Sequence, residues 1–129
     1  MNISDQEFEQ IVTDALDELP GKYISNLSNV AIVYEDEPTE DQRIELKLHC
    51  NETLYGLYQG IPLTKRGMGY NLVLPDKITI FKNPLIGSSH DIADLKAKAK
   101  HTLWHEIAHH FGLGHKRIHE LEDKANGRN

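Results

Sequence analysis

Apolar positions near the start of the chain recur at the spacing of an amphipathic helix. Between Ser4 and Leu19 the repeating apolar residues are Phe8, Ile11, Val12, Ala15 and Leu19, with acidic residues on the opposite face. Spacings of three and four residues place such side chains on one face of a helix, which then packs on a core. Ser4 followed by Glu7 predicts a capping box at the helix start, and Pro20-Gly21 predicts the helix end.

Short apolar and aromatic runs in the middle of the chain predict strands. They lie at Val30–Tyr34, whose β-branched residues predict that both faces are covered, at Thr53–Tyr58 and at Lys77–Phe81. Apolar runs this short, bounded by Gly, Pro or acidic residues, are typical of strands rather than of helices.

Residues 40–49 carry two conflicting patterns. Thr39 followed by Gln42 favours a helix start, whereas Ile44, Leu46 and Leu48 alternate as in a strand. We favour a short helix for this segment.

A long helix is predicted in the last third of the chain. Ser88 and Ser89 offer N-caps, and the helical pattern continues to about Gly112. The stripe expected to face the sheet consists of Ile92, Leu95, Ala99, Leu103, Ile107 and His110. The opposite arc, expected to border a cleft, consists of Lys98, His101, His105, His109 and Gly112. On the core side His110 is expected to be buried and hydrogen-bonded, and a last short helix is predicted from about Lys116 to Lys124.

The end of the long helix reads HEIAHHFGLGH from His105 to His115, which is the pattern H-E-x-x-H-x-x-G-x-x-H. Residues four apart lie one turn above each other, so His105 and His109 can bind the same zinc ion. Glu106 is rotated by about 100° around the helix axis and can act as a general base on a water molecule. Gly112 suits a left-handed helix end, after which the chain can bring back His115 as the third ligand. A fourth position left open for water is typical of a catalytic zinc site.

Length and composition narrow the possible classes of protein. A chain of 129 residues suits one domain covering residues 1–129. The net charge of −6 argues against a nucleic-acid partner. Cys50 is the single cysteine, so it cannot form an internal disulfide and is expected to be a small hydrophobe in a reducing compartment. The N-terminus lacks a signal-peptide pattern and no apolar run has membrane-spanning length, so we expect a cytoplasmic protein without a membrane partner.

Several stretches resemble the short bacterial zincin-like metallopeptidases, a family of small neutral zinc proteases. They lie at 30–38, 54–64, 74–81 and 105–112, and together they extend over nearly the whole chain. The resemblance implies an α+β zincin fold, with a small mixed sheet packed on the N-terminal helix and the long active-site helix. It also implies zinc as the cofactor and a peptide or protein substrate. The strand Lys77–Phe81 would then form the rim of the cleft and pair with an extended substrate.

The resemblance leaves the third zinc ligand open. Where this chain has His115, many members of the family carry an acidic residue, so a nearby carboxylate such as Asp123 is the alternative ligand. Neither methionine follows His115, so the Met-turn of the larger metzincins is not expected.

Three functions are compatible with the motif, and we favour the first. In a zinc-dependent metallopeptidase, His105, His109 and His115 bind zinc, and Glu106 takes the proton of the attacking water and delivers it to the leaving amine. The H-x3-H-x5-H spacing is also found in zinc-dependent endoribonucleases, but those enzymes lack a Glu after the first histidine, and the acidic charge argues against RNA. The third alternative is a non-catalytic zinc-binding interaction module. The sequence predicts no oligomeric state.

Overall fold

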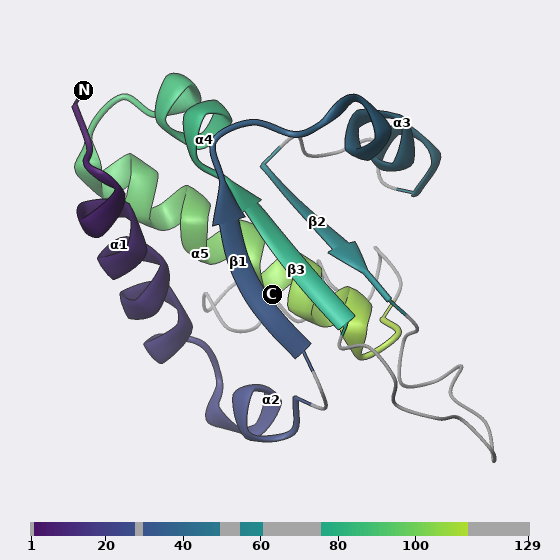
Figure 1. Cartoon of the computed structure of the whole chain (residues 1–129). Helices are drawn as coiled ribbons and strands as arrows, with labels where there is room; N and C mark the ends of the chain where they lie inside the picture. Colours follow the sequence, from purple (N-terminus) through teal and green to yellow (C-terminus); the bar gives the residue numbers. More distant parts are fainter. Residues whose placement is uncertain (1, 28–29, 50–54, 61–75, 114–129) are drawn as a thin grey trace, which may run out of the picture.

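The computed structural model describes residues 2–27, 30–49, 55–60 and 76–113. Its elements, in chain order, are α1 (Asp5–Asp17), α2 (Gly21–Ser25), β1 (Val30–Glu35), α3 (Glu40–His49), β2 (Gly56–Gln59), β3 (Asp76–Phe81), α4 (Lys82–Ser88) and α5 (Ile92–His110). Figure 1 shows the strands in one layer, with α5 behind them and α1 alongside. The helix expected at 116–124 and Cys50 lie outside the described residues.

β3 is the central strand of the sheet, whose order is β1-β3-β2. β1 pairs with β3 in parallel, with Val30 opposite Asp76, whereas β2 is antiparallel to β3, with Gly56 opposite Ile80. The sheet is therefore mixed. The strands predicted at Val30–Tyr34 and Lys77–Phe81 are confirmed, and β2 contains the second half of the run predicted from Thr53.

The prediction that both faces of β1 are covered is wrong. Val33 is 37% exposed, and the other residues of β1 are only partly buried. Within the described sheet β1 pairs along one edge alone, with β3. A β-branched run is compatible with a central or an edge strand, because periodicity does not report which neighbours cover it.

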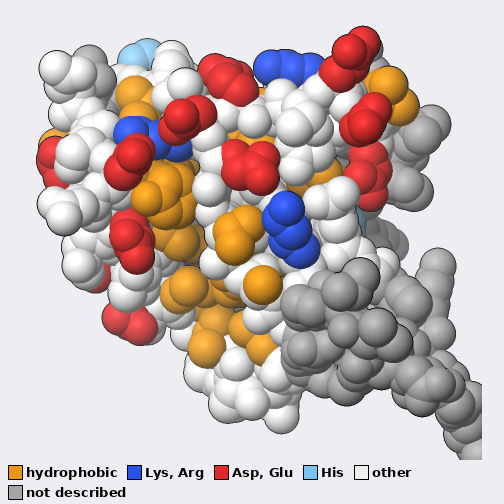
Figure 2. Space-filling model, viewed as in Figure 1, with side chains coloured by type: hydrophobic (Ala, Val, Ile, Leu, Met, Phe, Trp, Pro, Cys, Tyr) orange, Lys and Arg blue, Asp and Glu red, His pale blue; other side chains and the backbone are white. Residues whose placement is uncertain are grey.

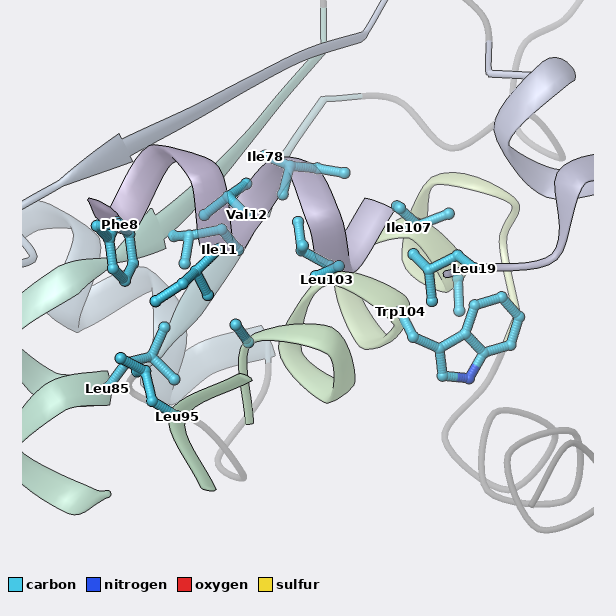
Figure 3. Packing of buried hydrophobic residues seen from close by; sticks show 14 residues of the cluster. Phe8, Ile11, Val12, Leu19, Ile78, Leu85, Leu95, Leu103, Trp104 and Ile107 are labelled. Atoms are coloured by element: carbon cyan, nitrogen blue, oxygen red, sulfur yellow. The ribbon is translucent and has the colours of Figure 1, made fainter. Parts of the chain in front are cut away.

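The hydrophobic core lies between one face of the sheet and helices α1 and α5. Figure 3 shows side chains from α1, β3, α4 and α5 meeting there: Phe8, Ile11, Val12, Ile78, Leu85, Leu95, Leu103 and Ile107. The apolar stripe predicted for the first helix is confirmed, because each of its five members is buried. The capping box is also present, with Ser4 Oγ accepting the Glu7 backbone N–H at 3.1 Å and Glu7 Oε1 accepting the Ser4 N–H at 3.2 Å. Burial of each large side chain contributes about 1.5–3 kcal/mol.

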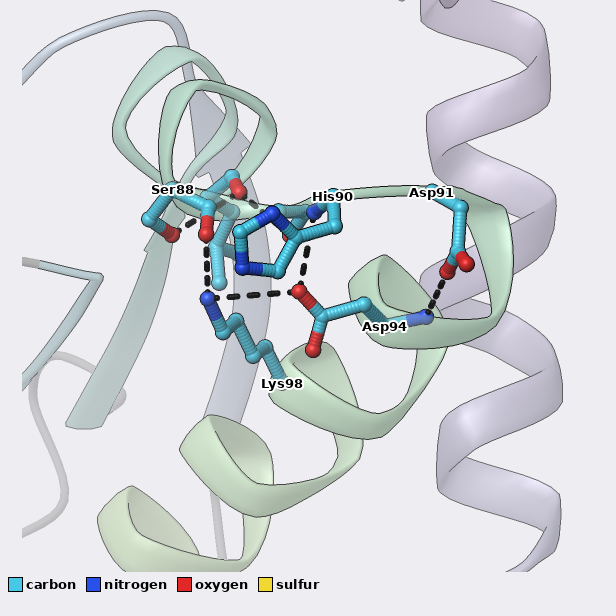
Figure 4. A network of polar contacts seen from close by, with 7 residues as sticks. Ser88, His90, Asp91, Asp94 and Lys98 are labelled. Atoms are coloured by element: carbon cyan, nitrogen blue, oxygen red, sulfur yellow. Dashed lines mark hydrogen bonds and ion pairs between the residues drawn. The ribbon is translucent and has the colours of Figure 1, made fainter.

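The start of α5 differs from its prediction. Asp91 is the N-cap, and its Oδ1 accepts the backbone N–H of Asp94 at 2.8 Å (Figure 4). Ser88, one of the two predicted caps, is instead the last residue of α4, a helix that was not predicted from the sequence. Pro84 lies in the first turn of α4, where a helix has no internal acceptor for an N–H. The chain therefore passes from β3 directly into a helix that begins at Lys82 and has Pro84 in its first turn.

Ile92 is the member of the predicted α5 stripe that is not buried. Its side chain is 47% exposed because it lies in the first turn of the helix, before Leu95 enters the core. The remaining members of the stripe, including His110, are each 0% exposed, so the rest of the prediction is confirmed.

α3 confirms the helix favoured for residues 40–49. Thr39 Oγ1 accepts the Gln42 N–H at 3.1 Å, and Gln42 Oε1 accepts the Thr39 N–H at 2.8 Å. These reciprocal bonds fix the helix start. Figure 1 places α3 beside β2, and Gln59 Nε2 donates to Glu45 Oε2 at 3.0 Å between them.

Acidic side chains are spread over the face shown in Figure 2, above α1 and near α3, with few basic ones between them. This distribution agrees with the net charge of −6. Among the described residues, no helix is long and apolar enough to cross a membrane.

Candidate metal centre

The second half of α5 contains a continuous buried stretch. Every residue from Thr102 to Ala108 is buried, including His105 and Glu106, which are each 2% exposed. On the arc expected to border a cleft, His105 is buried, whereas His101 and Gly112 are exposed and Lys98 and His109 are partly exposed. β2 lies against the neighbouring side of the helix, at Thr102 and Glu106. Ideal Cβ geometry at Gly56 would bring a methyl group within 2.6 Å of Thr102 Cγ2 and 3.3 Å of Glu106 Cγ.

His105, Glu106 and His109 form a cluster of candidate metal-ligating side chains. One ligand atom from each residue lies within 4.8 Å of the other two. The Nε2 atoms of His105 and His109 are 3.2 Å apart, and the two rings are nearly perpendicular, at 81°. The spacing of four residues therefore places both imidazoles on one face of the helix, with their Nε2 atoms close together.

The two oxygens of the Glu106 carboxylate have different surroundings. Oε1 accepts the backbone N–H of Tyr58 on β2 at 2.9 Å. Oε2 is buried 3.9 Å from His105 Nε2 and has no hydrogen-bond partner among the described residues. Burial raises the pKa of Glu106 from 4.5 to about 7, whereas the Tyr58 N–H acts to lower it. A carboxylate with a pKa near neutrality is suited to proton transfer at neutral pH.

The helix ends in the left-handed turn that was predicted at Gly112. Gly112 has a φ of 77°, in the left-handed region that favours glycine. Its N–H donates to His109 O at 2.9 Å, and the Leu113 N–H donates to Ala108 O at 3.0 Å. This pair of bonds is a Schellman motif, which turns the chain away immediately after the histidines.

The other histidines considered in the sequence occupy different positions. His101 is exposed, with its ring centroid 6.3 Å from that of His105. His110 is 0% exposed, and its Nδ1 lies 3.2 Å from Asp76 Oδ2, which confirms the buried, hydrogen-bonded histidine that was expected. His115 and Asp123, the two candidates for the third ligand, lie outside the described residues.

Sequence reasoning missed two residues next to the site, Tyr58 and Asp76. Tyr58 reaches Glu106 through its backbone N–H, and no side-chain pattern can indicate such a contact. Asp76 is 3% exposed at the start of β3. The signal available for Asp76 was an acidic residue directly before the predicted strand Lys77–Phe81, but the same pattern is common in exposed turns.

The donor set fits a zinc ion. Two nitrogens bound tetrahedrally to zinc at its usual bond length lie about 3.3 Å apart, close to the 3.2 Å between the Nε2 atoms of His105 and His109. Glu106 Oε2, buried beside them without a partner among the described residues, suits a water molecule at the ion. Imidazole nitrogens with a neighbouring carboxylate are the ligand chemistry that zinc prefers.

A sequence model of the zincin-like metallopeptidases matches residues 27–125, which is most of the chain. The chain belongs to the zincin-like metallopeptidase family. The resemblance found in the sequence is therefore confirmed, as is the expected α+β zincin-like fold with its small mixed sheet and long helix. The family is one of zinc metallopeptidases. A search of curated proteins found no match to the chain.

One expectation drawn from the family resemblance is wrong for this zincin-like protein. The strand Lys77–Phe81 was expected to form the rim of the cleft and to pair with substrate. In the structure this strand is β3, and both of its edges are already paired, with β1 and with β2. A strand paired on both edges has no free backbone groups for a further strand. Within the described sheet, β2 is the strand next to Glu106 that pairs along one edge only.

Proposed function

We propose that this protein is a zinc-dependent peptidase in which His105 and His109 hold the metal and Glu106 is the general base. The supporting observation is the convergence of two imidazole nitrogens 3.2 Å apart beside a buried carboxylate. His115 is the proposed third ligand. When bound, zinc polarises the scissile carbonyl and lowers the pKa of a water molecule toward neutrality.

Glu106 would carry out the proton transfers of the reaction. Glu106 Oε2, the oxygen without a partner among the described residues, would accept the proton of the attacking water. The same carboxyl would then deliver the proton to the leaving amine. Its pKa of about 7 suits both steps, because a group that must accept and donate a proton works best near the pH of its surroundings.

We place the substrate along β2 in the proposed peptidase. Tyr55 O accepts the Phe81 N–H at 2.8 Å, and positions two apart in an antiparallel ladder share the same direction. The intervening positions Gly56 and Tyr58 therefore direct their backbone groups away from β3, and the Tyr58 N–H meets Glu106 there. An extended peptide added at this edge would have its backbone beside the general base.

The test of this function is Glu106→Gln, measured as cleavage of casein by zinc-loaded protein. The variant is expected to retain zinc, measured by metal analysis, and to lose cleavage by about 10²- to 10⁴-fold, the usual contribution of a general base. Glu9→Gln makes the same chemical change at an exposed position of α1 and is expected to cleave like the wild type.

Structured RNA is offered in parallel to separate the alternatives. Undiminished casein cleavage by Glu106→Gln would contradict the proposed role of the residue. Cleavage of RNA but not of casein would make the protein an endoribonuclease, and tight zinc binding without cleavage of either would indicate a non-catalytic module.

A further inference from the structure

A second group of buried polar side chains lies beside the candidate metal centre. Asp76 and His110 are 3% and 0% exposed. Asp76 Oδ2 accepts the Tyr58 hydroxyl at 2.5 Å and lies 3.2 Å from His110 Nδ1. Burial of a carboxylate is unfavourable unless hydrogen bonds compensate for the lost water. These contacts tie together β2, β3 and the last turn of α5.

Tyr58 connects this group to the proposed general base. Its hydroxyl binds Asp76, and its backbone N–H donates to Glu106 Oε1 at 2.9 Å. The ring also packs edge-on against His110, with centroids 5.8 Å apart. One residue of β2 is therefore held at its side chain and in turn holds the Glu106 carboxylate by its main chain.

Gly56 supplies an independent indication that β2 is seated closely on α5. A Cβ at this position would lie 2.6 Å from Thr102 Cγ2, well inside contact distance, and 3.3 Å from Glu106 Cγ. Thr102 is itself 1% exposed, and its hydroxyl donates to Lys98 O at 2.8 Å. The strand approaches the helix at a distance that a larger residue would not allow.

We propose that Tyr58, Asp76 and His110 are positioning residues that fix the Glu106 carboxylate for catalysis. Asp76 holds the Tyr58 hydroxyl and the His110 ring, so that the Tyr58 N–H stays on Oε1. Oε2 then remains directed to the zinc side, where it is 3.9 Å from His105 Nε2. This inference rests on the proposed function, in which Glu106 is the general base. A general base acts efficiently only when its support holds it within about 0.5 Å of the productive position.

The first test is Tyr58→Phe, which removes one hydroxyl and keeps the ring. We expect kcat for casein cleavage to fall about 10- to 100-fold, because small misplacements of reacting groups lower rates by such factors. KM and zinc content should stay unchanged. The matched control is Tyr34→Phe on β1, whose hydroxyl makes a 3.5 Å contact with Asp5 O away from the site. It is expected to keep both kcat and KM. Gly56→Ala, which would displace β2 from α5, is also expected to lower kcat.

The second test needs neither zinc nor activity. In metal-free, ¹⁵N-labelled protein, the Tyr58 amide proton should resonate downfield, because it donates to a carboxylate, and should move upfield in Glu106→Gln. Tyr58→Phe, Asp76→Asn and Gly56→Ala should shift the same amide (residue 58) and speed its exchange with solvent, whereas Tyr34→Phe should leave it unchanged.

The two tests fail independently. A residue-58 amide that is insensitive to Tyr58→Phe and Gly56→Ala would overturn the positioning role, even in an active peptidase. A fall in kcat/KM that arises from KM alone would also overturn it, because positioning of a base acts on kcat. Wild-type protein that cleaves no casein, together with the expected amide shifts, would overturn the proposed function and leave the hydrogen-bonded support of Glu106 standing.

Discussion

The two halves of α5 are built differently. From Ile92 to His101 the helix is amphipathic: Leu95 and Ala99 are buried, and the remaining side chains are exposed or partly exposed. From Thr102 to Ala108 every residue is buried, and this half contains His105 and Glu106. The first half follows the pattern of a helix that stabilises a fold, whereas the second buries ionisable groups that water would solvate better. Polar groups are buried in this way where a protein gives up some stability for function.

Two carboxylates on the same helix illustrate the contrast. In the first half, the backbone N–H of His90 lowers the pKa of Asp94, with a further contribution from Lys98 (Figure 4). In the second half, burial raises the pKa of Glu106 to about 7. The first carboxylate is stabilised in its charged form by a backbone N–H and a lysine, and the second is held in a buried place that disfavours its charge.

The largest expected effects are those of core truncations, which should be alike in the two halves. Leu95 and Leu103 are each 0% exposed, one in each half. Replacing either with Ala should lower the free energy of unfolding by about 2–5 kcal/mol through lost burial and a residual cavity. Urea denaturation followed by circular dichroism measures this. Ile92→Ala, at a 47% exposed position, should change stability by only about 0.5 kcal/mol. An equal loss at Ile92 would contradict the boundary drawn between the exposed first turn and the core.

Of the two halves of α5, only the second should contribute to stabilisation by zinc. At a free zinc concentration about 100 times the dissociation constant, binding adds roughly 2.7 kcal/mol to the free energy of unfolding. Zinc addition should raise the Tm of the wild type, and chelation should return it to the metal-free value. The rise should be absent in His105→Ala and in His109→Ala. His101→Ala, one turn earlier and exposed, is the matched control and should keep the full rise. A rise that survives in His105→Ala would place the metal elsewhere.

The pH should affect stability with opposite signs in the two halves of α5. In metal-free protein Glu106 has a folded pKa of about 7, above its usual 4.5. A raised pKa means that the group favours folding below pH 4.5 and that this contribution is lost as the pH rises through 7. Glu106→Gln should therefore gain stability relative to the wild type between these pH values, measured by urea denaturation at each pH.

Asp94→Asn should behave in the opposite way. The pKa of Asp94 is lowered from 3.8, so its contribution is present above pH 3.8 and is lost as the pH falls through the folded value. The variant should be slightly less stable than the wild type at neutral pH, and the difference should shrink in acid. Parallel pH profiles for the two variants would remove the distinction between the halves.

The sequence by itself determined the local features of this protein. The capping box at Ser4 and Glu7, the left-handed end at Gly112 and the helical spacing of His105 and His109 all depend on neighbours within a few residues. Interactions of that range are encoded in short patterns, so they can be predicted from a single chain. The proposed zinc-binding pair belongs to this class because His105 and His109 are one helical turn apart.

Only the tertiary structure decided which strand lies beside Glu106 and what surrounds this carboxylate. β3 was expected at the rim and is central, whereas β2 approaches α5 at Gly56 and places the Tyr58 N–H on Glu106. Tyr58, Asp76 and His110 come from separate parts of the chain, and their contacts depend on strand order and packing. Periodicity shows that a face is apolar but does not identify its neighbour, and a backbone donor has no side-chain signature in the sequence. The proposed ligands His105 and His109 were therefore visible in the sequence, whereas the contacts that hold Glu106 beside them required the fold.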